Sequence, residues 1–325
     1  MGILQYKKIL NTNLNISVLG LGTWAFGSDK WWGWQSDSKS EEVLETAFEN
    51  GVNLIDTAPV YGRGHSQTVI GRFLRQNKIR EKIVLADKLG LRWHNRKVEH
   101  NLSKKSMLEE IDLSRKRLCT DYIDIYQVHW PDPDTPIAET AAVMEKFYAQ
   151  GIIKAVGLSN YSLKQIQEFR KYCPVHILQM PYNMFERNIE IEIAPFCLQQ
   201  GISLLVYSPL DSGILTGKFF FEKQRVPKDL RRKYHSGLKA PLLTINNEFF
   251  KQAKDIALNY NASLAQLALN WCIAQSGITS VLAGARNIAQ IKDNLLCFAW
   301  KPKQLDLAKI NELLEIRKRE IKKSL

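Results

Sequence analysis

The sequence predicts an α/β protein folded as a (β/α)8 TIM barrel with an N-terminal β-hairpin cap and extra helices. Short apolar runs alternate with segments of helical periodicity from residue 18 to about residue 296. The runs number eight and read as near-continuous apolar segments, as strands do when both faces of their sheet are covered. Eight strands in alternation with helices close into a parallel barrel. We find no linker, so residues 1–325 are expected to form a single barrel domain.

The first element is expected to be a small hairpin at the bottom of the barrel. Ile9-Leu10 and Ile16-Ser17 flank Asn11-Thr12-Asn13, and asparagine tolerates the positive φ of a tight turn. The barrel strands are then predicted at residues 18–22, 52–56, 83–88, 122–129, 152–158, 176–180, 202–207 and 279–283.

The helices between these strands are predicted from apolar residues that recur every three or four positions. One interruption stands out, because residues 217–245 form a long, basic, irregular stretch that an extra helix around Phe249 to Asn259 follows. Long loops inside compact domains are usually functional or disordered. The regular helices are predicted around Val43–Phe48, Met107–Leu118, Ile137–Phe147, Leu163–Phe169, Ile193–Phe196, Leu264–Trp271 and Ile288–Leu295.

The charge of the chain favours an anionic ligand. The net charge is +12 and the pI is near 9.4, which suggests nucleic acid as a first possibility. However, the basic residues are scattered, with denser patches only at Arg225 to Lys233 and in the tail at Arg317 to Lys323, which we expect to be a solvated helix end. No nucleic-acid motif accompanies them. A phosphate-bearing cofactor explains the excess at least as well, and we expect no nucleic-acid partner.

The cysteines and the apolar segments favour a cytoplasmic protein without a membrane span. The cysteines are odd in number and none is paired at CxxC spacing, which argues against a disulfide scaffold or a structural zinc site. The first residues do not resemble a signal peptide, and no apolar run approaches the roughly 18 residues of a membrane span. The five cysteines are Cys119, Cys173, Cys197, Cys272 and Cys297.

Four polar residues stand where predicted strands end, or just beyond. Asp56 ends the second strand and is followed by Tyr61, Lys88 ends the third strand, and His129 ends the fourth. In a (β/α)8 barrel, polar residues at the C-terminal ends of strands are typical of catalysis. Together they can transfer a proton at a site where no metal is needed.

These residue types suit the reduction of a carbonyl group. The developing alkoxide needs a proton, and a tyrosine with an unperturbed pKa of about 10 can supply it when a lysine ammonium lowers that pKa. Asp56 fixes Lys88, and His129 donates a hydrogen bond to the substrate oxygen. Taken singly, Tyr61 could be a packed aromatic, Asp56 and Lys88 a structural ion pair, and His129 a core histidine. Their shared placement favours the functional interpretation.

The motifs resemble those of the aldo-keto reductases over roughly residues 6–300, most closely a bacterial branch that resembles general stress and aldehyde-reducing members. The resemblance implies a TIM barrel, NADPH/NADP+, a small-molecule carbonyl substrate and Tyr61 as the proton donor. It is carried by Asp56-Thr57-Ala58-x-x-Tyr61-Gly62, the strand-ending Lys88, Val128-His129-Trp130, Gly157-Leu158-Ser159-Asn160, Val206-Tyr207-Ser208-Pro209-Leu210, Gly213-x-Leu215-x-Gly217-Lys218 and Gly284-Ala285-Arg286.

The same resemblance implies the cofactor site. Ser159, Asn160 and Gln179 are expected to bind the nicotinamide carboxamide, and Tyr207 to stack on its ring. The glycine-rich turn after the seventh strand suits a pyrophosphate, and Arg286 favours NADPH over NADH. The remaining expected cofactor residues are Gly22, Thr23, Trp24, Asp56, Ser208, Pro209, Leu210, Gly213, Leu215, Gly217, Lys218, Gly284, Ala285, Gln290, Asp293 and Asn294.

The substrate pocket is expected to be aromatic. Trp24, Trp93 and Trp130 follow strand ends, so they are expected to line it together with Tyr61 and His129. Trp31, Trp32 and Trp34 either line the pocket or cover the barrel mouth. The glycines after residue 20 are spaced G-x-G-x-x-x-x-G, so the cofactor binds without a Rossmann fold.

One departure and two alternatives accompany the resemblance. The family commonly has Ser-Glu after the Tyr-Gly segment, whereas Ser66 is followed here by Gln67, which removes a helix N-terminal charge worth about 0.3–1 kcal/mol. A cofactor-sensing protein that resembles potassium-channel β-subunits would have the same tetrad. A Schiff-base aldolase using Lys88 is a third possibility. The carbonyl substrate, the direction of the reaction and the oligomeric state are left open.

Overall fold

The computed structural model describes residues 4–28, 31–95, 97–220 and 229–324, and its centre is a closed barrel of eight parallel strands. Each strand pairs with the next along the chain, and the last pairs with the first, so the predicted barrel is confirmed. Each predicted strand overlaps an observed one. The barrel strands are β3 (Leu19–Gly22), β4 (Leu54–Asp56), β5 (Val84–Leu89), β8 (Ile123–Val128), β9 (Ile153–Ser159), β10 (Ile177–Pro181), β11 (Ser203–Tyr207) and β12 (Ile278–Gly284).

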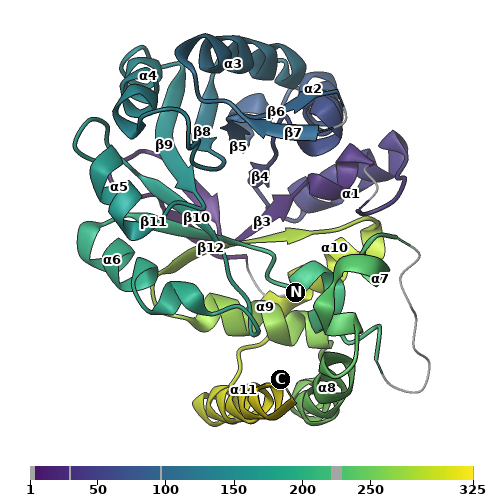
Figure 1. Cartoon of the computed structure of the whole chain (residues 1–325). Coiled ribbons are helices and arrows are strands. Elements are labelled where there is room, and N and C mark those ends of the chain that lie inside the picture. The colour runs from purple at the N-terminus through teal and green to yellow at the C-terminus, as the bar shows by residue number, and fades with distance from the viewer. Residues whose placement is uncertain (1–3, 29–30, 96, 221–228, 325) are drawn as a thin grey trace.

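Helices surround this barrel on its outside (Figure 1). Each predicted helix overlaps an observed one, whereas α2 (His65–Asn77) has no predicted counterpart. The buried apolar face of α2 follows directly on the Tyr61 segment, and its N-cap, Gly64, has no capping side chain. The other helices of the ring are α1 (Asp37–Glu49), α3 (Lys104–Leu118), α4 (Ile137–Ala149), α5 (Leu163–Phe169), α6 (Ile193–Gln200), α9 (Leu264–Ala274) and α10 (Ile288–Leu295).

The bottom of the barrel is closed by the predicted hairpin. Its strands, β1 (Tyr6–Lys8) and β2 (Asn15–Ser17), are antiparallel, and Asn11 in the connection has a φ of 59°. Ile9 and Ile16 are fully buried and pack in one cluster with residues such as Leu54 inside the barrel. The hairpin is therefore a plug, and it leaves the opposite end, where the strands have their C-termini, for the site.

The stretch predicted to be irregular contains more structure than expected. Among its described residues are α7 (Arg231–Tyr234) and the start of α8 (Leu242–Leu258), while residues 225–228 of the predicted basic patch lie outside the described residues. The tail forms α11 (Gln304–Ser324), which lies beside α8 (Figure 1). Arg317 is not solvated as predicted, because its guanidinium lies over the Phe185 ring and its Nε donates to Asn246 Oδ1 at 2.8 Å.

Short elements connect these larger ones. A hairpin of β6 (Leu91–His94) and β7 (Lys97–His100) follows β5, and it was not predicted because its residues are mostly exposed and lack a buried face. The 3-10 helices are η1 (Trp24–Gly27), η2 (Tyr61–Gly64), η3 (Arg80–Lys82), η4 (Asn188–Glu190), η5 (Asp211–Thr216), η6 (Ser236–Leu238) and η7 (Leu296–Ala299).

Candidate active site

The four predicted catalytic side chains lie together at the C-terminal mouth of the barrel. Lys88 Nζ donates to Asp56 Oδ1 at 2.6 Å and to the carbonyl oxygen of Thr57 at 3.1 Å. The same Nζ is 5.4 Å from the centre of the Tyr61 ring, and the Tyr61 and His129 rings meet edge to face at 6.1 Å. Asp56 and Lys88 are buried, whereas Tyr61 and His129 are half-buried. The ion pair therefore forms the floor, and the phenol and imidazole are left open to a substrate.

The environment sets the protonation state of each group. Burial raises the pKa of Tyr61, and the nearby Lys88 ammonium only partly offsets this, so the phenol keeps its proton. The sequence predicts that Lys88 lowers the pKa of Tyr61, but in the structure the effect of burial is larger. Burial also disfavours the Lys88 ammonium, but the neighbouring Asp56 carboxylate contributes most to a net rise in the Lys88 pKa. Burial, followed by the Lys88 charge, holds the pKa of His129 well below its usual range, so the imidazole is neutral at pH 7.

Two glutamines hold the other oxygen of Asp56. Gln179 Nε2 donates to Asp56 Oδ2 at 2.8 Å and to Gln127 Oε1 at 3.2 Å. Gln127 Nε2 lies 3.4 Å from the same carboxylate oxygen. A Cβ on Gly157 would come within 2.6 Å of Gln127 Cγ, so the glycine leaves room for this side chain. Gln127 was not predicted, although a polar residue inside an apolar strand was the available sign. Gln179, which the sequence predicts to bind the nicotinamide carboxamide, thus holds the Asp56 carboxylate.

The predicted nicotinamide residues lie beside the tetrad. Asn160 Nδ2 donates to the carbonyl oxygen of His129 and to Ser159 Oγ, both at 3.0 Å. Tyr207 Oη donates to Asn160 Oδ1 at 2.8 Å. Asn160 has a φ of 62°, a left-handed conformation that asparagine adopts more readily than most residues. Ser159, Asn160 and Tyr207, which the sequence predicts to contact a nicotinamide, are thus joined to one another.

The loop after β11, which the sequence predicts to hold a pyrophosphate, turns tightly on itself. Ser208, Asp211, Ser212, Gly213 and Gly217 all have positive φ. The N–H groups of Asp211 and Gly213 donate to the carbonyl oxygens of Ser208 and Leu210 at 3.0 and 2.8 Å, so hydrogen bonds within the loop hold this shape.

Three cations accompany this loop. A Cβ on Gly213 would lie 3.2 Å from Lys218 Nζ and 3.4 Å from Arg231 Nη1, so both side chains reach the turn. Burial lowers the pKa of Lys218 to about 8, and the charges of Arg231 and then Arg286 add to this effect. Arg231, which was not predicted, is buried and anchored by Asp229 and by the Ser212 carbonyl oxygen. Cations clustered beside a glycine-rich turn could hold a phosphate.

Arg286 joins α10 to the tryptophan-rich segment. Its Nη1 and Nη2 donate to the carbonyl oxygens of Trp32 at 2.5 Å and Trp34 at 2.8 Å, and its Nε donates to Gln35 Oε1 at 3.0 Å. Its backbone N–H donates to Gln290 Oε1 at 2.8 Å.

Two other predicted cofactor residues have structural partners. Asn294 Nδ2 donates to the Gly284 carbonyl oxygen at 3.3 Å. Asp293 accepts hydrogen bonds from Ser263 Oγ at 2.9 Å and Gln266 Nε2 at 2.6 Å. Ser263 is the N-cap of α9, so Asp293 connects α10 to the start of α9.

Aromatic rings form a wall beside Tyr61. The Trp24 ring stacks at 6.1 Å from Tyr61 and at 6.0 Å from Trp31, and it meets Trp32 edge to face at 5.4 Å. Trp93 donates from Nε1 to the Val60 carbonyl oxygen at 3.0 Å and lies at the rim with Trp130. Trp34 is 77% exposed, so it belongs to the outer surface rather than to this wall.

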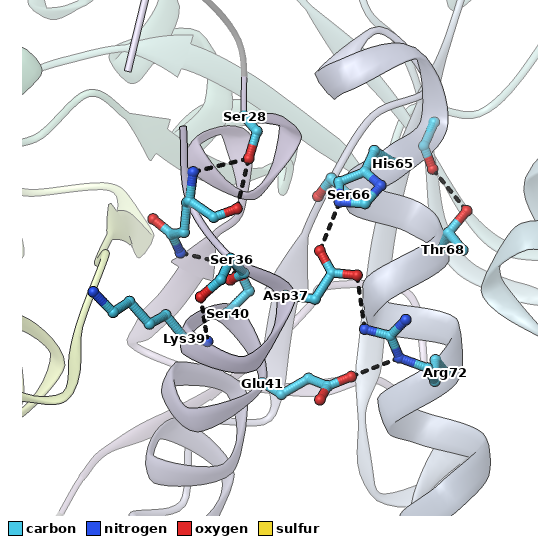
Figure 2. Close-up of polar contacts among 12 residues, drawn as sticks. Ser28, Ser36, Asp37, Lys39, Ser40, Glu41, His65, Ser66, Thr68 and Arg72 are labelled. Carbon is cyan, nitrogen blue, oxygen red and sulfur yellow. Dashed lines mark hydrogen bonds and ion pairs between the residues drawn. The ribbon is translucent and has the colours of Figure 1, made fainter. Parts of the chain in front are cut away.

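A cavity of about 560 Å³ lies beside the mouth, between the N-termini of α1 and α2. Figure 2 shows His65 and Arg72 of α2 both pointing at Asp37 of α1, at 2.8 and 2.9 Å. Arg72 also pairs with Glu41 at 2.7 Å. These contacts fix α1, which follows the tryptophan-rich segment, against α2, which follows Tyr61.

Gln67 has a partner that the sequence did not reveal. Its Nε2 donates to the buried Asp87 carboxylate at 2.9 and 3.1 Å and to Ser114 Oγ at 2.9 Å. Its Oε1 accepts from Arg117 Nη1 at 3.1 Å. The negative charge expected at residue 67 is therefore found at Asp87, next to Lys88 in the chain.

Other classes of site find no support in the described residues. Residues 4–28, 31–95, 97–220 and 229–324 contain no group of three or more histidine, cysteine or acidic side chains arranged for a metal ion. Within those ranges no helix combines the length and the apolar character needed to cross a bilayer. All five cysteines are free thiols.

A closed parallel barrel with these four side chains at its mouth is typical of oxidoreductases that use a nicotinamide cofactor. The model of the Aldo/keto reductase family matches residues 18–315, and the chain belongs to that family.

Relatives of known name agree with this assignment. The aldo-keto reductase YhdN of Bacillus subtilis (strain 168) is 38% identical over 96% of this chain and 94% of its own length. An NADH-specific methylglyoxal reductase of Escherichia coli (strain K12) is 34% identical over 95% of this chain and 98% of its own. The structure of the glycerol dehydrogenase AKR11B4 from Gluconobacter oxydans superposes with a TM-score of 0.88 at 33% identity, covering 96% of this chain and 95% of that one. Two of these relatives are named for different substrates, methylglyoxal and glycerol, and one of the three names states a cofactor, NADH.

Proposed function

We propose that this protein reduces aldehydes or ketones to alcohols with NADPH, and that Tyr61 donates the proton. One observation carries the proposal. A phenol that keeps its proton and a neutral imidazole lie side by side at the open mouth of the barrel, above a lysine whose position a buried aspartate fixes. This arrangement provides a proton donor and a hydrogen-bond donor for one substrate oxygen.

Each side chain has a separate task. When bound, the cofactor supplies a hydride to the carbonyl carbon. Tyr61 gives its proton to the oxygen as negative charge develops there. Lys88 stabilises the phenolate that remains, and Asp56 keeps the Lys88 ammonium charged and in place. Neutral His129 orients the carbonyl oxygen by donating a hydrogen bond.

The residues present fit a nicotinamide dinucleotide phosphate. Ser159, Asn160 and Tyr207 would hold the nicotinamide, and the loop after β11 would hold the pyrophosphate. Lys218, Arg231 and Arg286 would bind the remaining phosphate charge. Burial, followed by the charges of Arg231 and Arg286, lowers the pKa of Lys218, and a bound anion would favour its ammonium form. We favour NADPH over NADH because the guanidinium of Arg286 suits a phosphate, although one relative is named as NADH-specific.

The first test measures cofactor binding and turnover in the wild-type protein. Fluorescence titration with NADPH, NADH, 2′,5′-ADP and 5′-AMP separates the contribution of the 2′-phosphate from that of the rest of the cofactor. We expect NADPH to bind at least about tenfold more tightly than NADH, and 2′,5′-ADP more tightly than 5′-AMP. Equal affinities within each pair would contradict the NADPH preference while leaving the reductase proposal intact.

The second test replaces Tyr61 with phenylalanine. Turnover on a panel of small aldehydes and ketones, followed by nicotinamide absorbance, is expected to fall at least about a hundredfold while NADPH affinity is unchanged. Full activity in Tyr61→Phe would overturn the assignment of the proton donor. Tight NADPH binding by the wild type without turnover on any carbonyl would favour the cofactor-sensing alternative instead. Cytoplasmic location remains part of the proposal, and cell fractionation tests it.

A further inference from the structure

The carboxylate of Asp87 lies directly behind the tetrad, on the outer side of the strand that carries Lys88. Successive side chains in a strand point to opposite faces. In β5, Lys88 therefore points into the barrel toward Asp56, while Asp87 points outward to α2 and α3. Asp87 is fully buried, so its charge acts through protein rather than through water.

The direct partners of this carboxylate are neutral. Gln67 and Ser114 supply side-chain hydrogen bonds, and the Lys88 backbone N–H supplies another. Arg117 fixes the orientation of the Gln67 amide, because its donation to Oε1 leaves the NH₂ group facing Asp87. A glutamate at residue 67 would instead place two carboxylates against each other, and one of them would take up a proton. Gln67 therefore leaves the negative charge on Asp87.

The other titratable groups around Asp87 do not duplicate its charge near neutral pH. On α3, burial raises the pKa of Glu110 to about 8, so this carboxyl is protonated. On β8, burial raises the pKa of Tyr126 well above its usual value. Burial raises the pKa of Asp87 itself only to about 6, so it is ionised at neutral pH. The other titratable groups nearby are Arg117 on α3, Arg92 on β6, and Asp56, Tyr61 and Lys88 at the mouth.

We propose that Asp87 is a positioning residue whose negative charge keeps the proton on Tyr61 and so favours carbonyl reduction over alcohol oxidation. In reduction, hydride is added to the carbonyl carbon and the Tyr61 proton goes to the oxygen. In oxidation, the Tyr61 phenolate removes the alcohol proton as hydride leaves the carbon. The charge of Asp87 disfavours the phenolate and supports the Lys88 ammonium, in the same sense as Asp56. The preference for reduction rests on the proposed function, whereas the effect on Tyr61 does not.

The test follows the titration of Tyr61 in three proteins. These are the wild type, Asp87→Asn, and Gln67→Glu/Asp87→Asn, which returns one carboxylate to the same hydrogen-bonded pair. Ultraviolet difference spectra report tyrosinate formation, and subtracting the spectrum of each protein with Tyr61→Phe added isolates Tyr61. We expect Asp87→Asn to lower the midpoint by about half a unit to one unit and the double variant to restore most of that shift. If Asp87 has only a structural role, the Tyr61 midpoint should not depend on whether this pair of residues carries a negative charge.

Activity adds a second readout. In Asp87→Asn, the upper limb of the pH profile for reduction should move down by the same amount. With both substrates saturating, the ratio of kcat for alcohol oxidation to kcat for carbonyl reduction above neutral pH should rise about three- to tenfold. If the wild type reduces no carbonyl, the proposed function fails, but the spectroscopic titration still decides the role of Asp87. An unchanged Tyr61 midpoint in all three proteins would overturn the proposal. If Asp87→Asn does not fold, Asp87→Ser removes the charge and keeps an acceptor for Gln67.

Discussion

Replacing Asp56 with asparagine removes the counter-charge of Lys88 and retains the shape of the side chain. The two charged atoms are 2.6 Å apart, and only 1% of the lysine side chain and 5% of the aspartate side chain are exposed. Removing one partner of a buried pair costs about 3–5 kcal/mol, because a buried charge is left uncompensated. We therefore expect Asp56→Asn to lower the free energy of unfolding by about 3–5 kcal/mol at neutral pH.

A second estimate bounds the same loss. The stranded ammonium can give up its proton, which at pH 7 costs about 1.4 kcal/mol for each unit below its usual pKa of about 10.4, or about 5 kcal/mol in all. When Lys88 is deprotonated in the folded variant, the stability lost in Asp56→Asn falls by up to about 1.4 kcal/mol for each unit that the pH rises. In the wild type the folded-state pKa of Lys88 is raised, so the pair stabilises the protein fully below about pH 10.4 and loses its effect only above. Below about pH 10.4, the contribution of the ion pair to the stability of the wild type is thus constant, whereas the stability of Asp56→Asn changes with pH.

Urea unfolding of both proteins at about pH 7 and about pH 9.5 measures the difference. The control is the double variant Lys88→Met/Asp56→Asn, in which a neutral pair replaces the ion pair. It should recover most of the stability lost in Asp56→Asn. A loss below about 1 kcal/mol at neutral pH, or an equally large loss at both pH values, would refute the view that an uncompensated ammonium causes it.

Two further predictions concern the contact between α2, α3 and the barrel. Gly71→Ala should lower the free energy of unfolding by about 1–3 kcal/mol, because the added Cβ would come within 2.1 Å of the Arg117 carbonyl oxygen. Gly284→Ala, whose Cβ would meet only Gly22 O at 3.6 Å, is the control, and an equal loss in both would contradict the clash. Glu110 has a folded pKa of about 8, above its usual 4.5, so it stabilises the wild type at low pH and this effect is lost as the pH rises to about 8. In urea unfolding, Glu110→Gln should remove that loss of stability, up to about 5 kcal/mol at about 1.4 kcal/mol for each pH unit between 4.5 and 8, and an unchanged slope would contradict it.

The barrel and the positions of the tetrad residues were predictable because short segments of the sequence indicate both. A strand buried on both faces is a short apolar run, and polar residues mark its end, as Asp56 does in β4 and Asp87 and Lys88 do in β5. The hairpin plug was visible for the same reason, since Ile9 and Ile16 bracket a turn. These features need no knowledge of which distant residues meet.

The parts that escaped prediction depend on distant contacts. Arg231 looked like one more charge in a basic, irregular stretch, but the fold brings it to Gly213. Gln67 looked like a lost charge, and only the packing of α2 against β5 shows that Asp87 supplies it. The hairpin of β6 and β7 was missed because its exposed residues lack the alternation that marks a half-buried strand.

The alternation of side chains across the barrel wall separates the site into an inner and an outer layer. In β5, Lys88 faces inward and Asp87 outward; in β8, Gln127 reaches Asp56 inside while Tyr126 packs outside against Phe147. Neighbours in sequence therefore act on opposite sides of one strand. The inner layer holds the reacting groups by direct hydrogen bonds. The outer layer holds Asp87, whose carboxylate is bonded to the Lys88 backbone rather than to its side chain, so it acts on the tetrad side chains through its charge. Such an arrangement lets the proton affinity of Tyr61 be changed from the helix side without disturbing a single contact of the tetrad side chains.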